Sequence, residues 1–176
     1  MCAYQIFNRV LEFVAANISH QNWKHRQASL RAFCTLLEGS DTHKMQSATV
    51  KALVEFIRLL DDNSEDVQFN AAFCLNKIAE FFPECFVQHQ QFSEILDMIS
   101  SKLQRSVRVS IELCNIFKLA DHAKNQPSQV LEQSIEKLCS SLIINAFRMD
   151  TQNNDLSLAD RSFVAAMGLI NNTHNW

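Results

Sequence analysis

Residues 52–84 read ALVEFIRLLDDNSEDVQFNAAFCLNKIAEFFPE, and this stretch decides the fold because it predicts two amphipathic helices joined by a short acidic turn. Apolar residues recur at spacings of three and four on both sides of the turn at residues 61–63. Ser64 stands where it can cap the second helix, and Pro83 cannot continue that helix. The stretch therefore predicts a helical hairpin.

The same pattern recurs before and after this hairpin at one constant interval, which we call the repeat interval. The columns of apolar residues that share the repeat interval are Leu11/Leu53/Ile95, Val14/Phe56/Met98, Ala15/Ile57/Ile99, Leu30/Ala72/Cys114, Ala32/Cys74/Ile116 and Phe33/Leu75/Phe117. It falls in the range of roughly 40–47 residues that is typical of the helix pairs of HEAT and armadillo arrays. We therefore predict an all-α fold, an α-α superhelix or HEAT/armadillo-like solenoid. Its single array would hold about four helical hairpins, at residues 3–38, 43–82, 89–122 and 128–171.

The composition agrees with this fold class and argues against several others. Only two glycines and two prolines are present, whereas sheet proteins need many such residues in their turns. A net charge of −3 without a basic block argues against a nucleic-acid partner. No apolar run approaches the roughly 20 residues that span a membrane, and no secretory leader is visible, so we expect no membrane insertion.

Patterns of catalytic or metal-binding residues are missing from the sequence. The histidines and cysteines form no HExxH, HxH or CxxC motif, and glycine is too scarce for a phosphate-binding loop. We therefore expect no enzyme activity, no metal and no cofactor. Cys34, Cys74 and Cys114 lie on apolar faces of predicted helices, which favours free thiols in a reducing compartment over a disulfide framework.

Local signals mark the ends of the predicted helices. Asn22 is a candidate N-cap for the second helix, and Gly39 is expected to follow that helix as a C′ residue, able to take a positive φ. We expect Trp23 to pack between repeats. The turn acids Asp61, Asp62, Glu65 and Asp66 are expected to be turn and capping residues.

Both ends of the predicted array carry apolar residues on several helix sides. Helices at the free ends of an array need a polar outer face. These ends therefore suggest a piece of a longer solenoid, although the same residues would also fit a fold in which they pack inward.

Three segments of the sequence resemble the importin-β family, in that family's order. Residues 22–39 (NWKHRQASLRAFCTLLEG) resemble its Asn/Asp-Trp turn, arginine-containing helix and Ala-Phe…Leu-Glu-Gly ending. Residues 70–84 (NAAFCLNKIAEFFPE) resemble the next repeat, and residues 108–117 (RVSIELCNIF) resemble the one after. The similarity runs through essentially the whole chain and corresponds to a central block of the family, just past its acidic loop.

The resemblance implies a non-catalytic segment of a nuclear import receptor, found in the cytoplasm and the nucleus. In the family, this block grips the basic helix of an importin-α-type adaptor on its concave face, and the complete receptor also binds Ran GTPase and FG nucleoporins. A basic cargo or adaptor helix is therefore the expected partner. The alternatives are a generic HEAT-repeat scaffold for a protein complex and a truncated remnant of a larger solenoid.

The candidate binding residues lie on the second helix of each repeat. Glu38, Glu80 and Asp121 recur near the C-terminal ends of these helices at nearly the repeat interval, as a carboxylate ladder for a basic helix. Phe73 and Asn115 stand where the family has tryptophans; Phe73 still offers a ring to a cation, and Asn115 offers none. The alternative is that the carboxylates are ordinary solvated side chains.

Overall fold

The computed structural model describes residues 2–39, 42–83, 85, 106, 108–113, 115 and 116. The chain divides into two compact units, Met1–Cys85 and Phe86–Trp176. The helices of the first unit are α1 (Cys2–Asn17), α2 (Trp23–Gly39), α3 (Thr42–Leu59) and α4 (Glu65–Phe81). Within the described part of the chain, no helix is long and apolar enough to cross a membrane.

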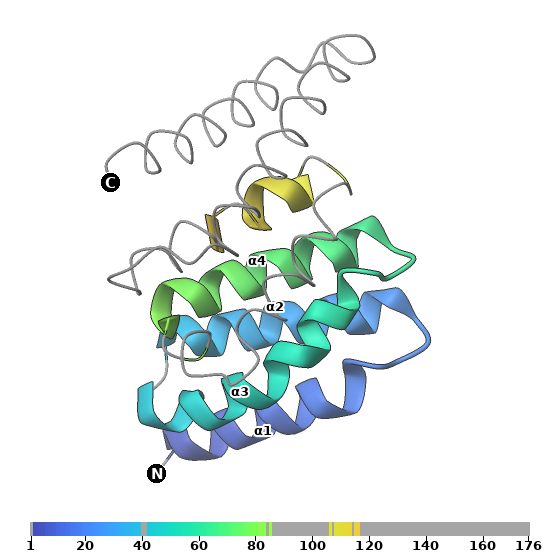
Figure 1. Ribbon diagram of the computed structural model, residues 1–176. Helices are drawn as coiled ribbons and strands as arrows, with labels where there is room; N and C mark the ends of the chain where they lie inside the picture. Colours follow the sequence, from blue (N-terminus) through green and yellow to red (C-terminus); the bar gives the residue numbers. More distant parts are fainter. Residues whose placement is uncertain are drawn as a thin grey trace, which may run out of the picture. The chain divides into compact units, whose positions relative to one another are not determined.

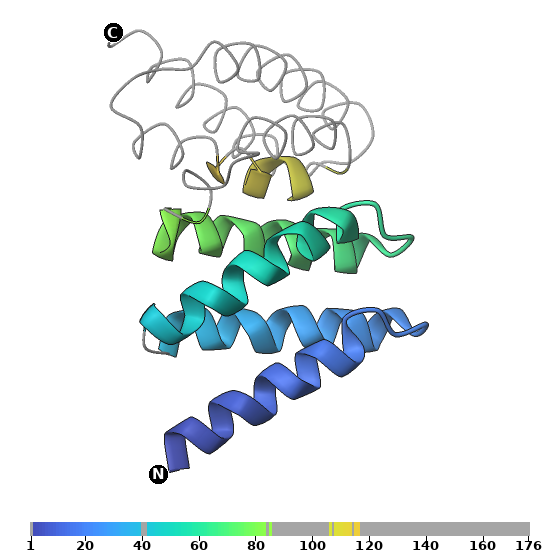
Figure 2. The same ribbon diagram turned by 60° about the horizontal axis from the view of Figure 1, so that its bottom comes forward.

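The first unit consists of two helical hairpins, α1–α2 and α3–α4, arranged in two layers (Figure 1). Helix α2 packs along α4 in one layer, and α1 and α3 lie in the other layer at an angle to them (Figure 2). The contact between α2 and α4 is the most extensive one, whereas α1 and α3 touch little. The all-α prediction is confirmed, and these helices lie within a residue or two of their expected positions.

The core of the first unit is built from the columns that share the repeat interval. Buried pairs, each with one member from either hairpin, are Val14 and Phe56, Leu30 and Ala72, and Phe33 and Leu75. The Phe33 ring meets the Phe56 ring edge-on, with their centroids 4.9 Å apart. Burial of each large side chain stabilises the fold by about 1.5–3 kcal/mol. Residues that recur in the sequence at the repeat interval thus occupy equivalent buried positions in the two hairpins.

The described residues of the second unit are helical from 108 to 113 and at 115 and 116. Val109, Leu113 and Ile116 are fully buried there, at the spacing of one helix face. The third and fourth expected repeats, residues 89–122 and 128–171, otherwise lie outside the described residues. The division of the chain into four repeats therefore stays a prediction.

Of the expectations for the helix ends, some are confirmed by the structure and others are not. The N-cap at Asn22 is confirmed, because its Oδ1 accepts a hydrogen bond from the Lys24 backbone N–H at 3.0 Å. The expectation for Gly39 is wrong: it is the last residue of α2, and no described residue has a positive φ. Trp23 is 36% exposed and its ring centroid lies 5.8 Å from the Lys24 Nζ. Its packing between repeats stays a prediction.

Cys34 of α2 and Cys74 of α4 face each other across the contact between these helices, with their Cα atoms 5.7 Å apart. The Cys74 thiol also donates a hydrogen bond to the Leu30 carbonyl oxygen at 3.2 Å. The two residues are far apart in the chain and meet because α2 packs along α4, and their separation is not a motif that the sequence displays. The expectation of free thiols stays a prediction.

Candidate functional site

Glu38 and Glu80 come together at a single ammonium group, that of Lys77. Glu38 lies in the last turn of α2 and Glu80 in the last turn of α4. The Lys77 Nζ lies 2.8 Å from Glu80 Oε2 and 3.9 Å from Glu38 Oε1. The packing of α2 along α4 thus places two carboxylates from successive hairpins beside one another, as the predicted ladder requires.

Aromatic rings flank the same lysine. Phe73 stands one helical turn before Lys77 and Phe81 one turn after it, so all three share one face of α4. The Lys77 Nζ lies 5.8 Å from the Phe73 ring centroid and 5.4 Å from that of Phe81. Phe69 extends the row by one more turn, with its ring centroid 6.4 Å from that of Phe73.

We name the group Glu38, Phe73, Lys77, Glu80 and Phe81 the α2–α4 surface. The side chains of Glu38 and Glu80 are 56% and 46% exposed, whereas that of Lys77 is 22% exposed. A carboxylate pair beside aromatic rings provides the contacts that ammonium and guanidinium groups prefer. The arrangement suits a cation, and the chain supplies one of its own.

The two remaining candidates are not brought to this surface by what the structure describes. Asn115 is half-buried in the helical residues of the second unit and is described there by itself. Asp121 lies outside the described residues. Its place in the carboxylate ladder therefore stays a prediction.

Lys77 and Phe81 are residues of this surface that the sequence analysis missed. Two signals in the sequence pointed to them: the spacing of three between Lys77 and Glu80, and the spacing of four between Phe73, Lys77 and Phe81. Both are common on helix surfaces. These spacings indicate a binding surface only once the packing of α2 along α4 places Glu38 near Lys77.

A second group of charged residues joins the two inter-helix turns. The Arg26 guanidinium donates through Nε and Nη2 to the two Asp62 carboxylate oxygens, at 2.6 and 2.7 Å. Its Nη1 donates to the backbone carbonyls of His20 and Gln21 in its own turn. Asp62 was expected to be a turn or capping residue, and its ion pair with Arg26 is a contact that this expectation did not include. It also accepts a hydrogen bond from the Ser64 N–H, so Asp62 connects the second turn to both hairpins.

The ionisation of Asp62 reflects this environment. Burial raises the pKa of the Asp62 carboxyl, but hydrogen bonds from Arg26 and from the Ser64 N–H, together with the nearby Arg26 and Arg58 charges, lower it by more. The net pKa lies below the ordinary value for an aspartate. The carboxylate form is thus the one that the fold stabilises.

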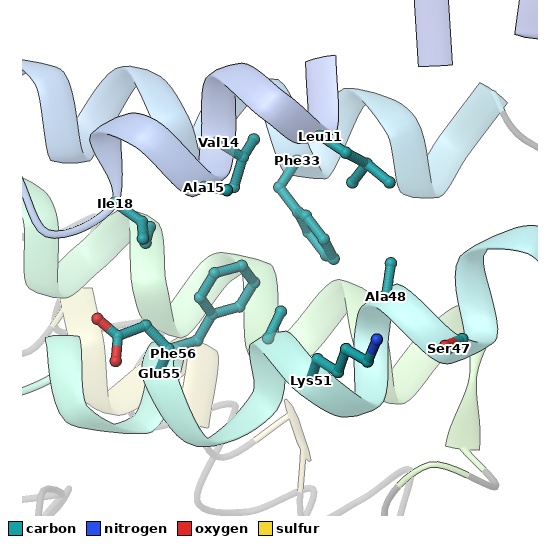
Figure 3. A pocket seen from close by; sticks show the side chains of 11 residues that line it. Leu11, Val14, Ala15, Ile18, Phe33, Ser47, Ala48, Lys51, Glu55 and Phe56 are labelled. Atoms are coloured by element: carbon teal, nitrogen blue, oxygen red, sulfur yellow. The ribbon is translucent and has the colours of Figure 1, made fainter. Parts of the chain in front are cut away.

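An apolar groove opens between α1 and α3, in the layer away from α2 and α4 (Figure 3). Its cavity volume is about 560 Å³. Leu11, Val14 and Ala15 approach from α1 and Ile18 from the turn that follows it, while Lys51 and Glu55 of α3 carry polar groups, as Figure 3 shows. The groove exists because α1 and α3 touch little while each packs on its own hairpin partner.

Groups of three or more histidine, cysteine or acidic side chains that could hold a metal ion do not occur among the residues that the structure describes. The α2–α4 surface and the α1–α3 groove are two features of this part of the chain that suit a ligand. Both suit a protein partner, one through charge and rings and the other through apolar contact.

Comparisons with known proteins agree with this architecture. The HEAT repeat family model matches residues 52–82. Importin subunit beta-1 of Saccharomyces cerevisiae is 27% identical over 154 residues, which cover 87% of this chain and 18% of that protein. The chain thus spans about a fifth of the length of this relative. The resemblance to importin-β noted in the sequence is confirmed over most of the chain.

Solved structures of importin-β give the same result. The structure of yeast importin-beta (Kap95p) matches 93% of this chain and 19% of its own, with a TM-score of 0.76 and 25% identity. A structure of the Kap95:Nup1 complex matches 92% of this chain and 19% of its own chain, with a TM-score of 0.74 and 25% identity. A structure of Kap95p with RanGDP matches 92% and 19%, and its TM-score of 0.73 at 23% identity supports the fold alone.

Proposed function

We propose that this chain acts as a segment of a nuclear import receptor and binds a basic helix, of a cargo or of an importin-α-type adaptor, on its α2–α4 surface. This role is non-catalytic protein transport between cytoplasm and nucleus. The similarity to importin subunit beta-1 over 87% of the chain supports the receptor part of the proposal. Ran GTPase and FG nucleoporins are proposed as partners of the complete receptor.

The observation that carries the binding proposal is the meeting of Glu38 and Glu80 at one cation. These two carboxylates are a full repeat apart in the sequence, yet they lie 3.9 and 2.8 Å from the same ammonium, and rings of α4 lie on either side of it. A basic helix that lies across α2 and α4 would find charge pairing and ring faces together. Asp121 and Asn115 are further candidate contact residues for the same basic helix.

Charge reversal tests this proposal. A basic amphipathic peptide should bind the wild-type chain with strong salt dependence, because surface charge pairs are screened. The triple variant Glu38→Lys, Glu80→Lys, Asp121→Lys should lose at least about tenfold in affinity, since like charges then face the peptide. Fluorescence anisotropy of the labelled peptide at several salt concentrations measures both effects.

The matched control reverses exposed acids elsewhere on the chain. Glu12 on α1 and Glu65 at the start of α4 are exposed, and Glu12→Lys with Glu65→Lys should leave most of the affinity intact. Circular dichroism verifies that each variant keeps its helices. Equal binding by the wild type and the triple variant would sink the assignment of this surface.

A second partner is favoured by the groove between α1 and α3. Its lining is mainly apolar and its volume of about 560 Å³ is enough for a large aromatic side chain. One solved relative, at 25% identity, is a complex with Nup1. We therefore propose that the groove receives apolar side chains of a nucleoporin-type segment, separately from the basic helix on the α2–α4 surface.

A further inference from the structure

Lys77 occupies the place that a partner's basic side chain would take on the α2–α4 surface. It pairs with Glu80 at 2.8 Å and approaches Glu38 at 3.9 Å. It also lies over the Phe73 and Phe81 rings. These are the contacts that the proposed function gives to the ligand, so in the free chain the surface already holds a cation.

We infer that Lys77 is a built-in competitor, which offsets one of the two carboxylate charges of the α2–α4 surface in the free chain and is displaced when a basic partner helix binds. This inference rests on the proposed function, because it names what the partner must replace. It adds a regulatory element that the carboxylate ladder alone lacks. The affinity of the surface for its partner is then set by how much more strongly the partner's cation interacts with Glu38 and Glu80 than Lys77 does.

The exposure of the two carboxylates favours this displacement. Glu38 and Glu80 are about half exposed, so water and salt screen their side of the pairing with Lys77, whereas the Lys77 side chain itself is 22% exposed. The lysine is attached by a flexible four-carbon chain and can move its ammonium into solvent. An arginine of the partner could instead pair with the carboxylates through two N–H groups and stack on the rings, which favours the exchange.

The first test compares the wild-type chain with Lys77→Gln for an arginine-rich amphipathic peptide that contains no lysine. The variant should bind about fivefold more tightly, because two carboxylates then face the peptide without an internal ammonium. Its affinity should also fall more steeply with salt. Lys24→Gln is the matched control, since Lys24 also lies over a ring, that of Trp23, but at the opposite end of α2 from Glu38.

A background lacking the carboxylates shows whether the effect is local. When Glu38→Gln and Glu80→Gln are already present, Lys77→Gln should bring no further gain in affinity. An equal gain in that background would mean a general effect of net charge, and it would overturn the inference.

A second measurement follows the wild-type chain itself. Lysines are acetylated with an N-hydroxysuccinimide ester and the modified sites are read by mass spectrometry. Lys77 should react faster when the peptide is bound, because its ammonium has left Glu38 and Glu80, whereas Lys24 should not change. Unchanged reactivity of Lys77 upon peptide binding would overturn the inference.

The two ideas fail in different ways. If the wild type binds the peptide and charge reversal abolishes binding, but Lys77→Gln gives no gain, then only the built-in competitor is overturned. If neither the wild type nor Lys77→Gln binds the peptide, the proposed function is overturned and this inference with it.

Discussion

Arg26 and Asp62 illustrate how the surroundings of a charged pair set its energetic value. Their closest atoms are 2.6 Å apart, the same distance as between Arg58 and Glu55. The side chains of Arg26 and Asp62 are only 14% and 6% exposed, whereas those of Arg58 and Glu55 are 61% and 30% exposed. Loss of one partner leaves a buried charge in the first pair and a solvated charge in the second.

We therefore predict that Asp62→Asn lowers the free energy of unfolding at pH 7 by about 3 kcal/mol. Glu55→Gln is the control and should lower it by less than about 1 kcal/mol, because the exposed pair is screened. Urea denaturation followed by circular dichroism measures both values. Similar losses in the two variants would contradict the role assigned to burial.

The lowered pKa of Asp62 also fixes the direction of a pH effect. Stability from this group is fully present above the pKa of about 3.9 that an aspartate has in an unfolded chain. It is lost as the pH falls through the lower pKa of the folded state. In Asp62→Asn this part of the acid-induced loss should be absent, so the stability difference between wild type and variant should shrink below about pH 4. A constant difference across the acid range would count against the Arg26–Asp62 interaction as its cause.

The helices α2 and α4 begin in similar ways but with different hydrogen bonds. Asn22 caps α2 through its side chain, which accepts from the Lys24 N–H. Ser64 stands at the N-cap of α4, yet its hydroxyl makes no capping hydrogen bond. Its backbone N–H is instead bonded to the Asp62 carboxylate. The two caps therefore depend on different side chains.

This difference gives a matched pair of substitutions. Asn22→Ala should lower the free energy of unfolding by about 1 kcal/mol, because the Lys24 N–H loses its acceptor. Ser64→Ala should change it by less than about 0.5 kcal/mol, since the hydroxyl it removes accepts no capping bond. Thermal and urea denaturation of both variants decides the point. A larger loss at Ser64 would show that its hydroxyl does cap α4 in solution.

The first unit presents two different faces because its helices form two layers. The layer of α2 and α4 carries the charged and aromatic surface, and the layer of α1 and α3 carries the apolar groove. We expect these faces to bind different partners without competition. A basic peptide and an apolar segment can then be tested separately on the same chain.

Filling the groove tests the second partner. Ala15 lines the groove, whereas Ala16 next to it on α1 does not, and both are exposed. Ala15→Phe should weaken binding of a Phe-Gly-repeat polypeptide by about tenfold, because the new ring occupies the cavity. Ala16→Phe adds the same side chain outside it and should bind as the wild type does. Isothermal calorimetry compares them, and equal affinities would remove the groove from the proposal.

The helices of the first unit follow from the sequence because their apolar spacing, turn residues and repeat interval are local or repeated signals. Asn22 as an N-cap, the end of α4 at Phe81 shortly before Pro83, and the buried columns through Phe33 and Phe56 all belong to this class. The expectation for Gly39 was wrong because the nearby sequence does not fix the residue at which a helix ends. Gly39 has no atom within 4 Å of where a Cβ would lie, so nothing there requires a glycine.

The candidate site could be predicted only in part from the sequence. The recurrence of Glu38 and Glu80 at the repeat interval indicated a shared face, since equivalent positions of stacked repeats align. The role of Lys77 depends on the distance between α2 and α4, and so does the proximity of Cys34 to Cys74; the pairing of Arg26 with Asp62 depends on how the two hairpins pack. The repeat interval and the helical spacing show which residues share one face of a helix. Which side chains of different helices come into contact is decided by how the helices pack. The sequence pattern by itself thus determined which face of each helix is apolar and which is polar. The tertiary structure decided which charges, rings and sulfur atoms of different helices lie within contact distance of one another.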